Sequence, residues 1–413
     1  MIKYKILPFL LGLLVNQNIV WIIKGNTTYI YIDAIFAIII CIIKFFGKQK
    51  KITIPPLVKY IKSYYFITIF ASLIGLIIFS DTKYYLSPIY GAIIFTVSFS
   101  ILLATILLQH EIKYMLKGFY CGFILNLLYS ILCYFLFKFN IEWRVIQYFS
   151  TGEESPFALY NNLYYRAQGF FMECSFYIAY LSIGLPIILY LTKYNYIKFF
   201  LIISCFLLSA ISFTGNIIFI ILSLFLYFIL IERKLVTRAN VIKAIFSISI
   251  IVILFAPQIS SSLQEMNFSE LFIESIEDLN INNEDNISNV TRMYGITNAL
   301  SLIATTPLGV GAGCSAPLLD LNFASQYGAI STYSFPIRIL LESGWIGFLL
   351  YLIGIISIVK NLFKLKNLWS KTLGISLLLC ILVQTANGIG WFGFILFILG
   401  ICTITINKQT KFV

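Results

Sequence analysis

The chain has 413 residues, of which 60% are hydrophobic and 11% are charged, and its mean hydropathy is +0.92. Because soluble domains carry about 25% charged residues, this composition excludes a soluble protein and indicates a polytopic membrane protein. The formal net charge of +12 would favour a nucleic-acid partner in a soluble protein. In a membrane protein, basic residues collect in the cytoplasmic loops instead, so no nucleic-acid partner is implied.

Apolar runs of membrane-crossing length follow one another along the chain. Most have roughly 17–25 residues, the length that crosses about 30 Å of hydrocarbon. We expect about twelve transmembrane helices, near residues 6–23, 28–46, 60–79, 86–108, 116–137, 170–191, 197–212, 216–231, 241–256, 336–359, 372–386 and 389–406. With the N-terminus inside, 22 of the 29 Lys and Arg residues fall at cytoplasmic ends, as the positive-inside rule requires. We therefore expect one all-α polytopic domain over residues 1–413 in the cell inner (plasma) membrane, with both termini cytoplasmic.

Two of the expected extracytoplasmic loops are long, at residues 138–168 and 257–335. The second begins with an acidic stretch, which a solvated surface explains better than a cation site because no spacing in it resembles a Ca²⁺ loop. Residues 291–306 then predict an amphipathic helix, since apolar residues recur there at helical spacing and Pro307 follows.

Arginine is rare in this chain, so its placement is informative. Four of the six arginines fall on the expected outer face, at Arg144, Arg166, Arg292 and Arg338. A guanidinium group makes paired hydrogen bonds to phosphate or carboxylate oxygens and keeps its charge, so this gathering indicates an anion-binding site. The alternative for Arg338 is a salt bridge to Glu342, four residues later on the same expected helix.

A glycine-rich turn, P-L-G-V-G-A-G, follows the amphipathic stretch. Gly309, Gly311 and Gly313 permit a tight backbone whose N–H groups can face a pyrophosphate. No strand precedes the pattern, as one would in a dinucleotide-binding fold. An ordinary turn explains these glycines about as well.

A second constellation, R-A-Q-G-F-F-M-E-C-S at residues 166–175, stands before the sixth expected span. Glu173 falls just inside the apolar run, where an unpaired carboxylate is costly, so it has either a structural partner or a function. Asp33, in the second span, raises the same question without a motif to decide it. His110, the only histidine, lies on the cytoplasmic side, which excludes histidine ligation of a metal at an outer site.

These motifs resemble those of the O-antigen polymerase (Wzy-type) and O-antigen ligase group. The resemblance rests on R-x-x-G-F-F-x-E-x-S before a span, an arginine and P-L-G-V-G-A-G in the second long loop, and L-L-E-S-G-W-I-G-F at the next span. It implies a membrane glycosyltransferase of GT-C-type architecture that joins lipid-linked oligosaccharide repeats and uses no nucleotide sugar, cofactor or obligatory metal. Its substrates would be carried on undecaprenyl pyrophosphate, and a chain-length regulator and a flippase of the same pathway are possible partners.

We hypothesise the following roles in catalysis and substrate binding. Arg166 and Arg292 would stabilise the departing pyrophosphate, and Glu173 or Glu342 would accept the acceptor's proton. Substrate contacts are expected from Arg338, Arg144, Tyr333 and the backbone at Gly309, Gly311 and Gly313.

Two departures from the group's pattern bear on these roles. Cys174 replaces a proline that often follows the glutamate in the group. Ligases usually carry a histidine and an asparagine before the final glutamate, where this chain has Tyr333 and Ser334. The missing histidine favours a polymerase, with a ligase as the alternative. A flippase is the alternative from another class. A flippase needs a charged central cavity that is reached from both sides, but here formal charge is scarce inside the spans and the long polar segments are two loops on one side.

Overall fold

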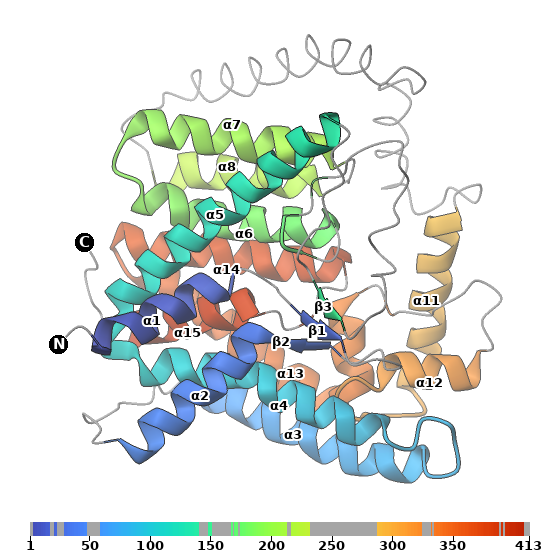
Figure 1. The fold of residues 1–413 in the computed structure, drawn as a ribbon. Helices are drawn as coiled ribbons and strands as arrows, with labels where there is room; N and C mark the ends of the chain where they lie inside the picture. Colours follow the sequence, from blue (N-terminus) through green and yellow to red (C-terminus); the bar gives the residue numbers. More distant parts are fainter. Residues whose placement is uncertain are drawn as a thin grey trace.

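The computed structural model of the chain describes residues 3–16, 20–22, 29–47, 58–139, 148–150, 167, 169–171, 174–212, 216–231, 287–323, 332, 334–387, 390 and 393–408. These residues form a bundle of α-helices with one small sheet (Figure 1). The helices are α1 (Lys3–Leu14), α2 (Ile32–Phe46), α3 (Val58–Ile78), α4 (Ser87–Leu107), η1 (Gln109–Glu111), α5 (Ile112–Lys138), α6 (Cys174–Leu191), α7 (Asn195–Ile211), α8 (Ile217–Leu230), α11 (Ile287–Ile303), α12 (Ser315–Asn322), α13 (Phe335–Lys364), α14 (Leu368–Asn387) and α15 (Gly393–Lys408). The expected class, an all-α polytopic membrane protein, is confirmed.

The number of membrane spans can be compared with the length and composition of the described helices. Among the described helices, six are long and apolar enough to cross a membrane, namely α3, α4, α5 with its preceding turn, α6, α13 and α14. Helices α1, α7, α8 and α15 are apolar but shorter, and the span expected at residues 241–256 lies outside the described residues. The count of twelve is therefore not confirmed.

The first expected span, at residues 6–23, is too long. Helix α1 ends at Leu14, and residues 20–22 form a strand instead. Asn16 explains the early end, because its side-chain amide donates to the carbonyl of Gly12 over 2.7 Å and to that of Phe119 over 3.2 Å. Such side-chain bonds compete with continuation of a helix.

The small sheet was not expected from the sequence. Strand β1 (Val20–Ile22) pairs antiparallel with β2 (Tyr29–Tyr31) and parallel with β3 (Tyr148–Ser150), giving the order β2-β1-β3. Since β3 belongs to the first long loop, residues 138–168, the sheet joins that loop to the connection between α1 and α2.

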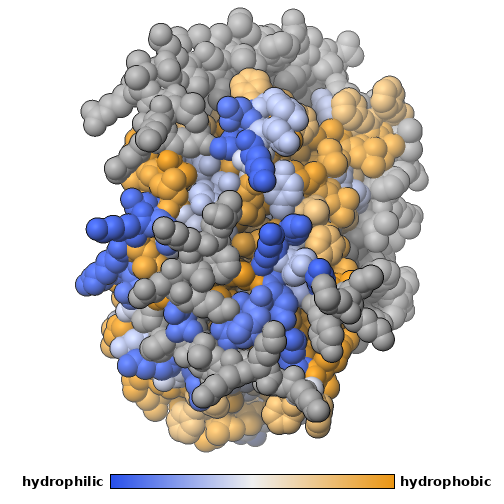
Figure 2. Space-filling model, turned by 90° about the vertical axis from the view of Figure 1, so that its left-hand side faces the viewer, coloured by the Kyte–Doolittle hydropathy of each residue, from blue (hydrophilic) through white to orange (hydrophobic). Residues whose placement is uncertain are grey.

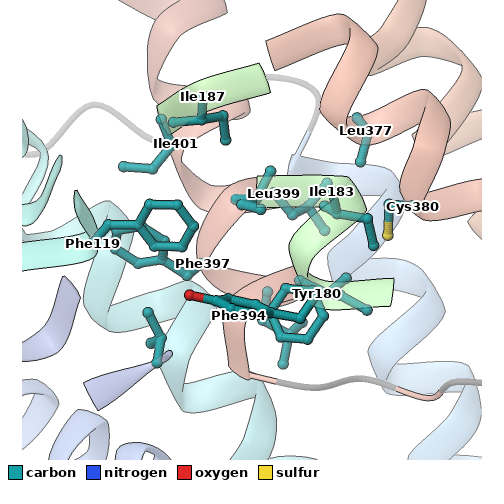
Figure 3. Close-up of a cluster of buried hydrophobic side chains, with 14 of the residues drawn as sticks. Phe119, Tyr180, Ile183, Ile187, Leu377, Cys380, Phe394, Phe397, Leu399 and Ile401 are labelled. Atoms are coloured by element: carbon teal, nitrogen blue, oxygen red, sulfur yellow. The ribbon is translucent and has the colours of Figure 1, made fainter. Parts of the chain in front are cut away.

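The main hydrophobic core lies where α5, α6, α14 and α15 meet (Figure 3). Phe119 of α5 stacks on Phe397 of α15 with ring centroids 5.4 Å apart, and Tyr180 of α6 meets Phe394 of α15 edge to face at 5.3 Å. Inside a membrane, such close packing holds helices together, because lipid tails are as apolar as the side chains.

A second core lies at one end of the bundle. It joins the end of α3, helices α11 and α12, the loop between them and the start of α13, through Phe79, Ala299, Leu302, Ile303, Val310, Cys314, Leu318, Leu319, Leu340 and Leu341. Figure 1 shows α11, α12 and the turn between α3 and α4 on the right. We call this the loop end of the bundle.

The opposite end carries lysine side chains. These stand at the beginnings or ends of helices that meet there, at Lys5, Lys44, Lys59, Lys62, Lys113, Lys117, Lys193, Lys198, Lys360, Lys364, Lys366 and Lys371. Figure 2 looks onto this lysine end and shows hydrophilic residues gathered between apolar side chains. The segregation of charge expected from the sequence is thus present as two chemically different ends of one bundle.

Candidate active site

Helix α13 is broken at Gly344, near the loop end. The φ of 66° and ψ of −175° at this residue lie outside the helical region, in a conformation that glycine alone adopts readily. In an unbroken helix the carbonyl groups of Leu341 and Glu342 would accept hydrogen bonds from the residues four positions later. The break removes those donors.

The loop at residues 307–313 takes their place. The N–H of Val310 donates to the Leu341 carbonyl over 2.9 Å, that of Gly311 donates to the Glu342 carbonyl over 2.8 Å, and that of Trp345 donates to the Pro307 carbonyl over 3.1 Å. An unpaired backbone group costs several kcal/mol inside a membrane protein, so these bonds stabilise the break. The loop and the broken helix therefore form one structural unit.

Glycine is required in this loop by geometry. The φ angles are 82° at Gly309 and 95° at Gly311, which side chains rarely tolerate. A Cβ atom at Gly309 would lie 2.6 Å from the Glu342 carbonyl oxygen, and one at Gly311 would lie 2.5 Å from the Cα of Ser72 in α3. The loop fits between α3 and α13 because these positions have no side chain.

Three backbone donors of this loop, at Gly309, Val310 and Gly311, are already occupied. The N–H of Gly309 donates to the Thr306 carbonyl over 3.0 Å, and that of Gly311 to the Glu342 carbonyl. The sequence pattern is compatible with two structures, a backbone site for a pyrophosphate and an ordinary turn. At Gly309 and Gly311 the N–H groups serve the turn and the helix break, and Gly313, with a φ of 72°, packs beside Gly91 of α4.

Arg338 and Glu342 form an ion pair on the first part of α13. The Nε atom of Arg338 donates to Oε1 of Glu342 over 2.8 Å. The hydroxyl of Ser315, the first residue of α12, donates to the same oxygen over 3.0 Å. The Glu342 side chain is 10% exposed and that of Arg338 is 37% exposed, so the carboxylate is enclosed while the guanidinium reaches the surface of the cluster.

The guanidinium group of Arg338 retains unused donors. Within the described part of the chain it donates through Nε alone, which leaves Nη1 and Nη2 available to a ligand. Nη1 lies beside Gly390, where a Cβ atom would be 3.2 Å away. Tyr31 and Tyr64 are close enough to interact electrostatically with this group. The arrangement presents a fixed cation near the junction of α14 and α15.

A polar clasp ties α12 to the turn between α3 and α4. The hydroxyl of Tyr84 donates to Oδ2 of Asp320 over 2.5 Å, and the ammonium of Lys83 lies 2.9 Å from the same oxygen. These two donors hold the pKa of Asp320 below its usual value. Because the clasp residues are far apart in sequence, no local pattern pointed to them.

A buried amide network holds the backbone of the second motif. The N–H of Phe170 donates to Oδ1 of Asn126 over 3.2 Å, and Nδ2 of Asn126 donates to the Asn16 carbonyl over 2.6 Å. The Tyr180 hydroxyl donates to Oδ1 of Asn16 over 2.5 Å. Phe171, in the same motif, packs against Phe394 of α15 with ring centroids 6.0 Å apart. Sequence reasoning missed these residues, since asparagines in apolar helices were the only available signal.

The structure describes part of the expected site. Arg338, Glu342 and the three loop glycines come together at the loop end, and His110 lies in η1 at the lysine end. Four other expected site residues, Arg144, Arg166, Glu173 and Tyr333, lie outside the described residues. Arg292 lies on helix α11, but its side chain is also outside the description. Helix α11 occupies most of the stretch where an amphipathic helix was expected, although Leu300, on the expected apolar face, is 52% exposed.

Residues 198–352 match the family described as O-Antigen ligase. The match runs from α7 through the break in α13, so it contains Arg292, the glycine loop, Arg338 and Glu342. It supports the group of O-antigen ligases and polymerases and does not separate the two. No curated protein matches the chain.

Proposed function

We propose that this protein is a membrane glycosyltransferase that joins lipid-linked oligosaccharide repeat units into a surface polysaccharide. The single observation that carries the proposal is the Arg338–Glu342–Ser315 cluster at the helix break. The cluster lies inside the region that matches the O-Antigen ligase family, whose members act on lipid-linked glycans. A guanidinium held in place through Nε, with no further acceptor among the described residues, is suited to recognise phosphate oxygens.

The reaction transfers a glycan from undecaprenyl pyrophosphate to a sugar hydroxyl. The hydroxyl oxygen attacks the anomeric carbon of the donor, and the bond from that carbon to the pyrophosphate oxygen breaks. Negative charge grows on the departing pyrophosphate, so a cation held in place beforehand lowers the barrier more than it stabilises the ground state. We assign this role to Arg338, together with Arg166 and Arg292.

Glu342 positions Arg338 in this proposal. Its Oε1 atom accepts from both Arg338 and Ser315, and its own carbonyl is held by Gly311. The carboxylate therefore fixes the guanidinium plane at Nε and leaves the Nη edge towards the donor. Such fixation matters because a misplaced catalytic group loses much of its effect.

The position of the histidine favours a polymerase over a ligase. The sole histidine, His110, is exposed in η1 at the lysine end, whereas Arg338 lies at the loop end. The ligase remains a second candidate because the matching family carries that description.

The experiment replaces Arg338 and measures glycan ladders in cells that depend on this protein. Arg338→Ala should shorten the ladder to single repeats and slow transfer by about 10²- to 10³-fold. Arg338→Lys should recover little, because an ammonium lacks the planar pair of donors. Lys366→Ala removes an exposed cation at the lysine end, away from the cluster, so it serves as the control and should leave the ladder intact.

Two results would contradict this function. Full-length polymer that stays on its lipid carrier in the Arg338→Ala strain would indicate a ligase. Lipid-linked repeats trapped on the inner face of the membrane would indicate a flippase.

A further inference from the structure

Asp33 is a buried carboxylate near the beginning of α2, towards the loop end, and it lies outside the region that matches the family. The residue is 4% exposed. Its Oδ1 atom accepts a hydrogen bond from the N–H of Ala34 over 2.8 Å. Among the residues that the structure describes, Oδ2 has no side-chain donor and no cation forms a salt bridge with the group.

Such a carboxylate is costly in an apolar bundle. Ionisable side chains inside membrane proteins are rare, and most pair with each other or serve a substrate or proton path. The first turn of α2 bonds Oδ1 through the Ala34 N–H, and the N–H of Asp33 itself also interacts with the carboxylate. No side chain among the described residues donates to Oδ2, which leaves this oxygen for another use.

The Oδ2 atom lies against the start of α15. It is the nearest atom to the position that a Cβ at Gly393 would occupy, and the side chain of Ile101 in α4 lies 3.0 Å from that position. Glycine at this position leaves room for the carboxylate.

The start of α15 also meets the other parts of the candidate site. Gly390, three residues before Gly393, lies beside Nη1 of Arg338. Three residues span at most about 11 Å of extended chain. Phe394, the residue after Gly393, packs against Phe171 of the second motif. Asp33 therefore lies beside Gly393, three residues from the glycine next to Arg338 and adjacent to the residue that packs on Phe171.

We propose that Asp33 accepts the proton of the attacking sugar hydroxyl. The inference rests on the proposed function and deepens it by naming the base. Glu342 is assigned to positioning instead, because its carboxylate is already paired with the guanidinium of Arg338, whereas Asp33 forms no ion pair with any described residue. Asp33 offers an oxygen, Oδ2, that packs against Gly393 and has no side-chain donor among the described residues, and its ligand is the free hydroxyl of an acceptor saccharide.

The step balances as a simple group transfer. The hydroxyl proton passes to Oδ2 of Asp33 while the hydroxyl oxygen bonds to the anomeric carbon. The bond from that carbon to the pyrophosphate oxygen breaks, and its electron pair leaves with the lipid pyrophosphate. The proton then passes from Asp33 to water or to the departing phosphate, which restores the carboxylate.

The test uses the full-length protein in detergent with a synthetic lipid pyrophosphate glycan as both donor and acceptor. Asp33→Asn preserves the shape of the side chain and an oxygen for the Ala34 N–H. We expect transfer per folded molecule to fall about 10²- to 10⁴-fold, with donor affinity within about threefold of wild type. Asp33→Glu should recover part of the rate, because it restores a carboxylate. Asp81→Asn, an exposed acid in the turn between α3 and α4, is the matched control and should behave as wild type.

Several outcomes would overturn the inference. Asp33→Asn with near-normal transfer per folded molecule excludes a base at this position, and so does an Asp33→Glu protein that folds normally but is no more active than Asp33→Asn. Equal losses of donor affinity and transfer in Asp33→Asn would indicate a structural residue. If wild-type protein neither binds nor consumes a lipid-linked glycan, the proposed function fails. If the wild-type protein is active and the Asp33 variants transfer glycan at the wild-type rate, the base assignment fails and the proposed function stands.

Discussion

The backbone N–H of Gly311 donates a 2.8 Å hydrogen bond to the carbonyl oxygen of Glu342, two residues before the break in α13. The bond joins a loop that follows α11 to the helix that carries Arg338. The position of the guanidinium therefore depends on a backbone contact between two segments of the second core, as well as on its own helix.

Replacing Gly311 should damage this unit. Gly311→Ala places a residue with a Cβ at a φ of 95°, which costs about 1–2 kcal/mol in a left-handed conformation. The added atom would also press on Ser72. We expect a lower thermal unfolding midpoint in detergent and a loss of glycan transfer larger than the loss of folded protein.

A glycine in regular helix provides the control. A Cβ at Gly354 of α13 would lie 3.3 Å from the Cβ of Tyr60 and farther from its other neighbours, and alanine favours helix over glycine by about 1 kcal/mol. Gly354→Ala should therefore change stability little. If Gly311→Ala were as well tolerated, the loop would not hold the helix break as described.

Ser315 should contribute to activity through Glu342. Ser315→Ala removes one of the two donors to Oε1, and a hydrogen bond to a charged group contributes about 1.5–3 kcal/mol. We expect transfer to fall about tenfold or somewhat more, with the protein still folded. The measurement is a double-mutant cycle with Glu342→Gln, in which the combined loss should be clearly smaller than the sum of the two single losses. Strictly additive losses would show that Ser315 acts independently of Glu342.

The clasp between α12 and the turn after α3 should depend on pH. The pKa of Asp320 is lowered by the Tyr84 hydroxyl first and by Lys83 second. Since an unfolded aspartate titrates near 3.9, the stabilisation is present above about pH 4 and is lost as pH falls through the lower folded pKa. The pKa values of Lys83 and Tyr84 are raised by their bonds to Asp320, so their contributions are present below about pH 10 and are lost as pH rises through the folded values.

Hydrogen exchange in α12 measures this dependence. Protection of α12 should be highest at pH values between the acid and the alkaline range in which the clasp is lost. Asp320→Asn should abolish the loss of protection at acid pH (the acid limb) while leaving hydrogen exchange in the core helices unchanged. Asp81→Asn again provides a control at an exposed acid in the same turn. An acid limb that persists in Asp320→Asn would assign the titration to another group.

Local patterns in the sequence predicted the helical bundle and one side-chain pair. Long apolar runs indicate helices wherever they occur, and the spacing of four residues between Arg338 and Glu342 made their ion pair one of two expected outcomes. The early end of α1 was missed, because Asn16 takes a partner on α5 that no local window contains.

The break at Gly344 illustrates what a single sequence does not specify. An isolated glycine in an apolar helix is usually tolerated in helical geometry, so nothing distinguished Gly344 from Gly354. The difference lies in the glycine loop, whose backbone supplies the donors that the break requires. The same holds for Ser315, which reaches Glu342 across 27 residues. Tertiary packing, rather than local preference, decides these partners.

The loop end should face away from the cytoplasm. The described lysine side chains other than Lys83 gather at the opposite end, and the positive-inside rule places such an end in the cytoplasm. Cysteine substitution tests this with two exposed lysines, Lys83 at the loop end and Lys366 at the lysine end. In intact cells a membrane-impermeant maleimide should label Lys83→Cys above the wild-type background and leave Lys366→Cys at that background until the membrane is opened. Labelling of Lys366→Cys alone would reverse the orientation, and Arg338 would then face the cytoplasm, where no glycan transfer outside the membrane is possible.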